Sequence, residues 1–460
     1  MKFLFFALVT STLFGINAEE LSGDWCGKIE NIGGCLSLNL HITKDLEGSL
    51  ECVEQKVSLP LNDVAFDGTH FSFKIDAVSA SYKGMVEQDK IVGIFSQGTE
   101  MPLHLSRGVL IASPLSRPQE EKALKNTHPV ENIQIINGEI SLAGTFVTPS
   151  GKETFPTVLF IPGSGPLDRD ETFCTHKPFL VIANHLADHG IASLRIDKRG
   201  VGESEGDFSK ATYQDFIKDY LAAISYLKTE KKGTILGLIT HSEGAMLAPE
   251  IATVSPDVNF MILLAGPGTT GLEVLLKQNA LILQANGVEQ KAIDQHVVLL
   301  KKICTLFQEG VSIENLKTTI KTEISTAHPD VQKQWKDLDP LLKMISAPWF
   351  QSFLTYDPQP YLSKVNVPTL AINGSIDLQV CPKQNLYRIE KALKEGNNPP
   401  LLTIELEGVN HALQHGVTGS PNEYATIEET VAPEILELIT RWIHQVSFPN
   451  VNKNDESSDS

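Results

Sequence analysis

Beyond about residue 130 the chain contains short, continuous apolar runs separated by longer amphipathic stretches. The runs are TVLFI (157–161), ASLRI (192–196), TILGLIT (234–240), FMILLAG (260–266) and TLAIN (369–373). Runs of this kind suit strands of a parallel sheet that is covered on both faces. One intervening stretch has apolar residues at helical spacing, namely Phe216, Tyr220, Ala223, Ile224 and Leu227. The alternation predicts an α/β domain with a mostly parallel sheet.

This domain is predicted to cover residues 131–447, from the hairpin-like ENIQIINGEISLAGTFVTP to a last amphipathic helix. That helix carries Ile435, Leu438, Ile439, Trp442 and Val446 on one face. About a hundred mostly helix-patterned residues separate FMILLAG from TLAIN. Because a structureless loop of that length is uncommon inside a domain, we expect a helical cap at about 268–362.

Residues 19–107 follow a different pattern. Short segments such as LSLNLHI, FSFKI and KIVGIFS are separated by Gly, Asp and Asn. This spacing predicts meandering antiparallel strands and hence a small β domain. The segment 108–130, rich in proline and charge, is predicted to be a linker, and the polar residues 448–460 are predicted to be a disordered tail.

The first 18 residues are predicted to be a signal peptide. Lys2 precedes an apolar stretch that is too short to span a bilayer, and Ala18 offers a small residue for cleavage. The mature protein is therefore expected to be exported, either periplasmic or secreted. Export permits disulfides, so Cys26, Cys35 and Cys52 could supply one pair or remain free thiols.

Charge and motif spacing exclude several function classes. The net charge is −18, with no long basic run, so nucleic acid and anionic membranes are not expected partners. No later stretch reaches transmembrane length, and stable membrane insertion is not expected. No zinc-type Cys/His spacing and no nucleotide-binding glycine spacing occurs, so the sequence predicts neither a metal nor an organic cofactor.

Ser242 is the candidate nucleophile. In THSEGA it lies between the strand-like TILGLIT and the helix-like EGAMLAPEI. A tight strand-to-helix turn exposes a serine hydroxyl and brings the N–H groups of the helix start near a developing oxyanion. Gly244 and Ala245 are small enough for close packing there. Thr240, however, stands where the G-x-S-x-G pattern has glycine, so a small polar residue in an ordinary connection is the alternative.

An acid and a base follow Ser242 in the required order. Asp377 comes just after the strand TLAIN, and His411 comes just after the strand LLTIEL. Open sheets carry their sites at the carboxyl ends of strands, and nucleophile, acid and histidine occur in this chain order in α/β-hydrolases. Singly, Asp377 could cap a turn and His411 could be a surface histidine. His415 is the nearest rival base.

An oxyanion hole is predicted from the backbone of the loop IPGSGPLDRD, which follows TVLFI, and from the residue after the nucleophile. The expected donors are the N–H groups of Ser164, with Gly163 as the alternate, and of Glu243. The charged residues beside this loop are interpreted as an ion-paired turn rather than as chemical groups; they are Asp168, Arg169 and Asp170. DKRGVGESEG (197–206) is interpreted as a structural turn near the site.

Together these segments resemble a known family. IPGSGPLDRD, LRIDKRGVGESEG, HSEG, APWFQSFLTYDPQPYL, INGSIDLQV, LEGVNHALQ and EYATIEETVAPEILELITRWI are similar to bacterial exported α/β-hydrolases of serine aminopeptidase and esterase type. The resemblance implies an α/β-hydrolase fold with a small β domain before it. It also implies a Ser–Asp–His triad, which falls on Ser242, Asp377 and His411. The chain departs from the family pattern at Thr240, at Ala245 and in NHALQ.

The sequence therefore predicts a serine hydrolase that cleaves small carboxylic esters through an acyl-enzyme. Trp349 and Phe350 of the cap could line an apolar acyl pocket or be ordinary core aromatics. The same triad would serve a peptidase or amidase of aminopeptidase type. A degenerate hydrolase domain that only binds is the third hypothesis, favoured by Thr240. The oligomeric state is left open.

Overall fold

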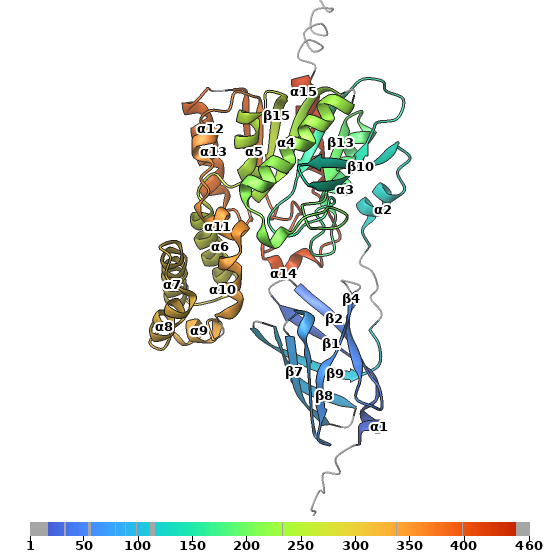
Figure 1. Cartoon of the computed structure of the whole chain (residues 1–460), viewed down its shortest axis with the longest axis vertical. Helices are drawn as coiled ribbons and strands as arrows, with labels where there is room; N and C mark the ends of the chain where they lie inside the picture. The colour runs from blue at the N-terminus through green and yellow to red at the C-terminus, as the bar shows by residue number, and fades with distance from the viewer. Residues whose placement is uncertain are drawn as a thin grey trace, which may run out of the picture. The chain divides into compact units, whose positions relative to one another are not determined.

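The computed structural model describes residues 17–447 except 32–33, 54–56, 79, 88, 98, 111–115, 232, 337 and 398. It divides the chain into two compact units, residues 1–114 and 115–460 (Figure 1). Of the predicted signal peptide only Asn17 and Ala18 are described, at the start of helix α1 (Ala18–Leu21), so export stays a prediction. The predicted tail, 448–460, lies outside the described residues. Within the described segments, no helix combines the length and apolarity needed to cross a bilayer.

The first unit is the predicted antiparallel β domain. Its strands are β1 (Gly23–Asn31), β2 (Gly34–Ile42), β3 (Gly48–Cys52), β4 (Val57–Pro60), β5 (Asn62–Phe66), β6 (His70–Ile75), β7 (Ala80–Glu87), β8 (Lys90–Gln97) and β9 (Thr99–Arg107), with a 3₁₀ turn at Asp76–Val78. They form one sheet in the order β4-β3-β2-β1-β9-β8-β7-β6-β5. Trp25, Phe71, Phe73 and Tyr82 fill its core.

Cys26 and Cys52 do not form a disulfide with each other. Cys26 of β1 lies opposite Asn39 of β2, whereas Cys52 of β3 lies opposite Leu38. Successive residues of a strand point to opposite faces of the sheet, so the two thiols lie on opposite faces. Both are free. The side chain of Cys35 is outside the described set.

The second unit contains a mixed sheet in the order β10-β11-β13-β12-β14-β15-β16-β17. Its strands are β10 (Val130–Asn137), β11 (Ile140–Val147), β12 (Phe155–Ile161), β13 (Ala192–Ile196), β14 (Gly233–His241), β15 (Val258–Leu264), β16 (Thr369–Gly374) and β17 (Leu401–Leu406). β10 and β11 form the antiparallel hairpin, β11 also pairs antiparallel with β13, and β12 to β17 pair in parallel with one another. The carboxyl ends of β12, β14, β16 and β17 therefore share one edge of the sheet.

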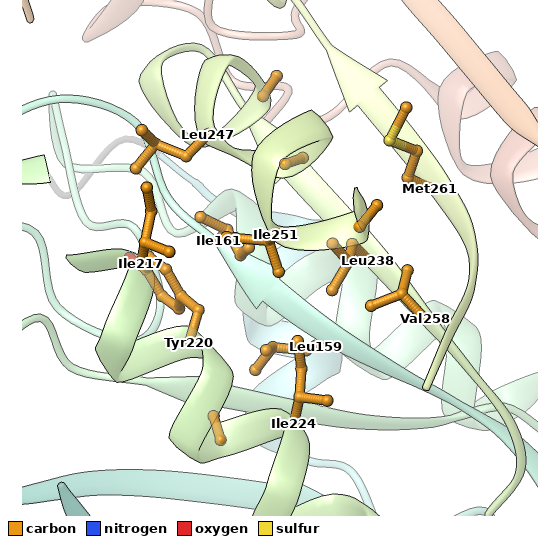
Figure 2. Packing of buried hydrophobic residues seen from close by; sticks show 14 of the residues in the cluster. Leu159, Ile161, Ile217, Tyr220, Ile224, Leu238, Leu247, Ile251, Val258 and Met261 are labelled. Carbon is orange, nitrogen blue, oxygen red and sulfur yellow. The ribbon is translucent and has the colours of Figure 1, made fainter. Parts of the chain in front are cut away.

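Helices cover both faces of this sheet. α4 (Tyr213–Glu230), α5 (Glu243–Val254) and α13 (Pro382–Glu395) pack into one hydrophobic cluster, and α3 (Pro178–Asp188) and α15 (Pro433–Ser447) pack into a second. Every residue of the apolar face predicted between 216 and 227 is buried in the first cluster. Figure 2 shows part of that cluster, with Ile251 of α5 near Ile161 and Leu238. The two-sided burial is what the continuous apolar runs predict, and the unit has the α/β-hydrolase fold.

The interval from β15 to β16 is helical. It contains α6 (Gly271–Ala285), α7 (Gln290–Gln308), α8 (Ile313–Ile324), α9 (Pro329–Gln334), α10 (Asp339–Ser346), α11 (Pro348–Thr355) and α12 (Gln359–Leu362). These helices enclose a hydrophobic core of their own, with Leu299, Ile303, Trp335 and Phe350 among its residues. Such a core explains why the segment is an ordered cap (Figure 1).

The segment predicted to be a linker includes a helix. α2 (Pro118–Leu124) lies within residues 108–130 and packs against α3. Its anchor is Arg117 just before it, whose guanidinium donates to the carbonyl oxygens of Ala425, at 2.7 Å, and Ile427. The side chain of Gln119 accepts from the N–H groups of Thr430 and Val431. These contacts are distant in sequence, so local composition could not reveal them.

We expect Ile251→Ala to lower the free energy of unfolding of the second unit by about 2–5 kcal/mol, because it leaves a cavity in the core. Ile251 is fully buried, whereas Val254, one turn later on α5, is 57% exposed. Val254→Ala is therefore the matched control and should change the free energy by less than about 0.5 kcal/mol. Urea unfolding followed by circular dichroism checks both. Equal losses in the two variants would contradict the packing described.

Candidate active site

Ser242 lies in a strained turn between β14 and α5. Its backbone has φ of +50° and ψ of −118°, which is unusual for a residue with a side chain. The turn is held by a hydrogen bond from its N–H to the carbonyl oxygen of Leu264, at 2.9 Å. At Gly244 a Cβ atom would lie 2.3 Å from the carbonyl oxygen of Ile161, so only glycine fits. This is the geometry of a nucleophile elbow.

Thr240 is accommodated where the elbow pattern usually has glycine. The residue is fully buried, and its hydroxyl donates to the carbonyl oxygen of Ile262 on β15, at 3.0 Å. The hydroxyl therefore does not lose its hydrogen bond on burial. The departure at position 240 leaves the turn at Ser242 intact.

The structure brings Ser242, His411 and Asp377 into contact in that order. His411 Nε2 lies 3.1 Å from Ser242 Oγ, and His411 Nδ1 lies 2.8 Å from Asp377 Oδ2. Asp377 Oδ1 accepts from the N–H groups of Gln379 and Val380, each at 2.8 Å. Asp377 and His411 are 2% and 5% exposed. A buried, fixed carboxylate can orient the imidazole so that Nε2 faces the hydroxyl.

His415 lies elsewhere. Its side chain is 47% exposed, and its two ring nitrogens lie 3.0 Å from Glu429 and 2.8 Å from Glu434. Both partners are surface carboxylates of the segment before and within α15. Of the two histidines considered from the sequence, only His411 is near Ser242.

Of the N–H groups predicted to form the oxyanion hole, one already donates a hydrogen bond to a side chain of the protein. The N–H of Gly163, the alternate donor, is taken by Glu171 Oε1 at 2.6 Å, so it is not available. The N–H groups of Ser164 and Glu243 donate no hydrogen bond to the part of the chain that the structure describes. A Cβ placed on Gly163 would lie 3.3 Å from Ser242 Cβ, so this loop runs directly beside the nucleophile. Ser164 and Glu243 remain the predicted pair of donors.

The charged residues of the loop after β12 form ion pairs. Arg169 makes a two-pronged contact with Asp197, with Nε and Nη2 at 3.0 and 2.6 Å from the carboxylate oxygens. Asp170 pairs with Arg195, which is buried. Asp168 accepts from the N–H groups of Asp170 and Thr172. These contacts hold the loop, in line with the structural role inferred from the sequence.

Three charged residues at the site were missed from the sequence: Glu171, Lys198 and His241. His241 Nδ1 lies 2.9 Å from Glu171 Oε1, and Nε2 lies 3.0 Å from the carbonyl oxygen of His411. Burial lowers the pKa of His241, but the Glu171 carboxylate outweighs it and raises the pKa above its usual value. Lys198 follows β13 closely and His241 is the last residue of β14, so their positions at strand ends were an available signal, because sites gather there. Glu171 lies farther along the loop after β12, and no such signal marks it.

Trp349 and Phe350 pack on each other, with ring centroids 5.3 Å apart. Phe350 is 5% exposed and belongs to the hydrophobic core of the cap. Trp349 is partly buried and packs on Phe208, with ring centroids 5.6 Å apart. An acyl pocket formed by these two residues stays a prediction.

Comparison with known proteins identifies the family. The family model described as serine aminopeptidase, S33, matches residues 177–414, more than half of the chain, and this span contains Ser242, Asp377 and His411. The chain belongs to the serine aminopeptidase S33 family. It is accordingly a hydrolytic enzyme, esterase-like or peptidase-like.

The individual proteins that this chain is similar to include esterases and a peptidase. Esterase EstD of Thermotoga maritima is 28% identical over 311 residues, which cover 67% of this chain and 66% of that protein. The Pyrococcus furiosus esterase Pf2001 has 14% identity and a TM-score of 0.43, covering 69% of this chain and 91% of its own. A proline iminopeptidase of Mycobacterium smegmatis has 14% identity and a TM-score of 0.42, covering 69% and 99%.

No metal centre accompanies this site in the described segments, where no three His, Cys, Asp or Glu side chains are grouped so that they could hold an ion.

His176, in the same loop as Glu171, should make stability depend on pH. Burial and the nearby charge of Arg117 lower the pKa of His176 to about 4. The unfolded chain takes up this proton below about pH 6.5, whereas the folded protein does so only near pH 4. The contribution of His176 to stability is therefore fully present above about pH 6.5 and is lost as the pH falls towards 4. His176→Gln should reduce the loss between pH 7 and 4.5 by on the order of 2 kcal/mol.

Urea unfolding of wild type and His176→Gln at both pH values measures this difference. An identical loss in the two proteins would show that His176 titrates normally in the folded state.

Proposed function

We propose that the protein hydrolyses carboxylic esters through an acyl-enzyme on Ser242. The observation that carries the proposal is the continuous contact from Asp377 through His411 to Ser242 Oγ. An alcohol needs an adjacent base to become a nucleophile, and that base must be held in the correct tautomer. The 28% identical esterase of Thermotoga maritima supports an ester rather than another acyl substrate.

In the first half-reaction, Ser242 Oγ attacks the ester carbonyl carbon while His411 Nε2 takes the hydroxyl proton. The negative charge that develops on the carbonyl oxygen is stabilised by the N–H groups of Ser164 and Glu243. The tetrahedral intermediate collapses when its bond to the alcohol oxygen breaks, and His411 gives its proton to that oxygen. In the second half-reaction, His411 activates a water that displaces Ser242 and releases the acid.

Peptidase or amidase activity is the second candidate, because the matching family model is that of a serine aminopeptidase. The same triad serves both reactions, since both pass through a tetrahedral oxyanion. Parallel assays of p-nitrophenyl esters and aminoacyl p-nitroanilides separate the two candidates. A binding protein without catalysis, the third hypothesis, would hydrolyse neither class.

Ser242→Ala should abolish turnover of p-nitrophenyl acetate and covalent labelling by a fluorophosphonate, because both need the hydroxyl. The fall in kcat is expected to exceed about a thousandfold. An unchanged circular dichroism spectrum and melting temperature serve as the control for folding. Labelling that persists in the variant would place the nucleophile at another residue.

His411→Ala should lower kcat by at least roughly a hundredfold, because Ser242 loses its base. The matched control is His415→Ala, four residues away and on the surface, which should retain nearly full activity. Steady-state kinetics on the same ester measure both. The assignment of the base is wrong if His415→Ala loses activity and His411→Ala does not.

A further inference from the structure

Two buried ion pairs flank the nucleophile. His241 and Glu243, the neighbours of Ser242 in sequence, each pair with an oppositely charged side chain from another loop. His241 Nδ1 lies 2.9 Å from Glu171 Oε1, and Glu243 Oε1 lies 3.0 Å from Lys198 Nζ. None of the four side chains is more than 4% exposed. Charges are rarely buried so completely unless a structural or functional demand keeps them there.

Both outer partners also bind the backbone of the same residue, Gly163. Glu171 Oε1 accepts from the Gly163 N–H at 2.6 Å. Lys198 Nζ donates to the Gly163 carbonyl oxygen. We refer to Glu171, Lys198, His241 and Glu243 as the Gly163 clamp. The clamp ties the loop after β12 to both sides of the turn that holds Ser242.

The contact with the carbonyl decides how the next peptide group is oriented. The C=O of Gly163 and the N–H of Ser164 belong to one planar trans peptide, so they point in opposite directions. Lys198 is 3% exposed and draws the carbonyl towards the interior. The N–H of Ser164 therefore points away from Lys198. If this peptide were rotated by half a turn, a carbonyl oxygen would replace the N–H and would repel an oxyanion.

We propose that Lys198 is a positioning residue that holds the Gly163–Ser164 peptide in the orientation an oxyanion hole requires, with Glu171 holding the preceding peptide. This inference rests on the proposed function, in which the Ser164 N–H stabilises the tetrahedral intermediate. Lys198 does not touch the substrate. Its effect is expected in the transition state rather than in substrate binding, because the carbonyl oxygen of the substrate gains full charge only there.

A simpler role for Lys198 is to neutralise the buried Glu243. Lys198→Met alone cannot separate the two roles, because it leaves a buried carboxylate without its cation. The double variant Lys198→Met/Glu243→Gln removes both charges. The glutamine can still accept the hydrogen bond that Tyr213 donates to Glu243 Oε2 at 3.1 Å. This variant lacks the contact with the Gly163 carbonyl and leaves no unpaired charge in the site.

The control variant removes a different ion pair, which Arg199, the next residue after Lys198, makes with Asp219 of α4. Arg199 Nε lies 2.7 Å from Asp219 Oδ2, with the two side chains 15% and 5% exposed, and neither residue bonds to Gly163. Arg199→Met/Asp219→Asn should lower the melting temperature but leave kcat within about twofold of wild type. This control shows how much stability and activity change when a largely buried ion pair near the site is lost and the Gly163 clamp stays intact.

The experiment compares kcat and KM for p-nitrophenyl acetate, and the inhibition constant of a trifluoromethyl ketone, in wild type, Lys198→Met/Glu243→Gln and the control. We expect kcat of the double variant to fall at least about tenfold and up to about a hundredfold, with KM within about threefold. The inhibition constant should rise by the same factor as kcat falls, because the bound hemiketal carries an oxyanion.

An unchanged kcat in the folded double variant would overturn the proposal and leave Lys198 as the counter-ion of Glu243. If that variant does not fold, Lys198→Leu/Glu243→Gln carries the same expectation, since leucine also cannot donate to the Gly163 carbonyl. Failure of the proposed function shows separately, as wild-type protein that neither hydrolyses the ester nor reacts with the fluorophosphonate.

Discussion

The positive φ of Ser242 is the constraint on which the site depends. A side chain is unfavourable in that conformation, so the surrounding structure must hold it. The N–H of Ser242 is bonded to β15, and the first turn of α5 reaches β12 so closely that position 244 must be glycine. The strain exposes the hydroxyl at the edge of the sheet. It also brings the free N–H of Glu243 beside it, because this is where the helix begins.

Buried charge is the second organising feature. A carboxylate or ammonium that leaves water loses several kcal/mol of solvation, which an ion pair regains only with good geometry and further hydrogen bonds. Glu171 and Lys198 each have such geometry, since each binds a charged side chain and the backbone of Gly163. Glu171 also has a positive φ, and its Oε2 is buried without a hydrogen-bond partner in the described structure. Unfavourable local energy is thus concentrated next to the reacting groups.

The sheet and the cap contribute differently. The sheet gathers the loops after β12, β14, β16 and β17 at one edge, and these loops supply the oxyanion donors, the nucleophile, the acid and the base. The cap has a core of its own, and Trp349, Phe353 and Tyr356 near its end also pack against the core of the sheet.

The sequence by itself determined the elements and their order. Continuous apolar runs predicted strands buried on both faces, the face from Phe216 to Leu227 predicted α4, and the order of Ser242, Asp377 and His411 predicted which residues could meet. These signals are local or depend only on chain order.

The tertiary structure decided the remaining features, because they depend on contacts between distant segments. It chose His411 over His415, gave the Thr240 hydroxyl a partner on β15, and assigned Phe350 to the core of the cap. It also brought Glu171 and Lys198 onto Gly163, which no spacing in the sequence predicts, since a buried ion pair forms only when separate loops close around it.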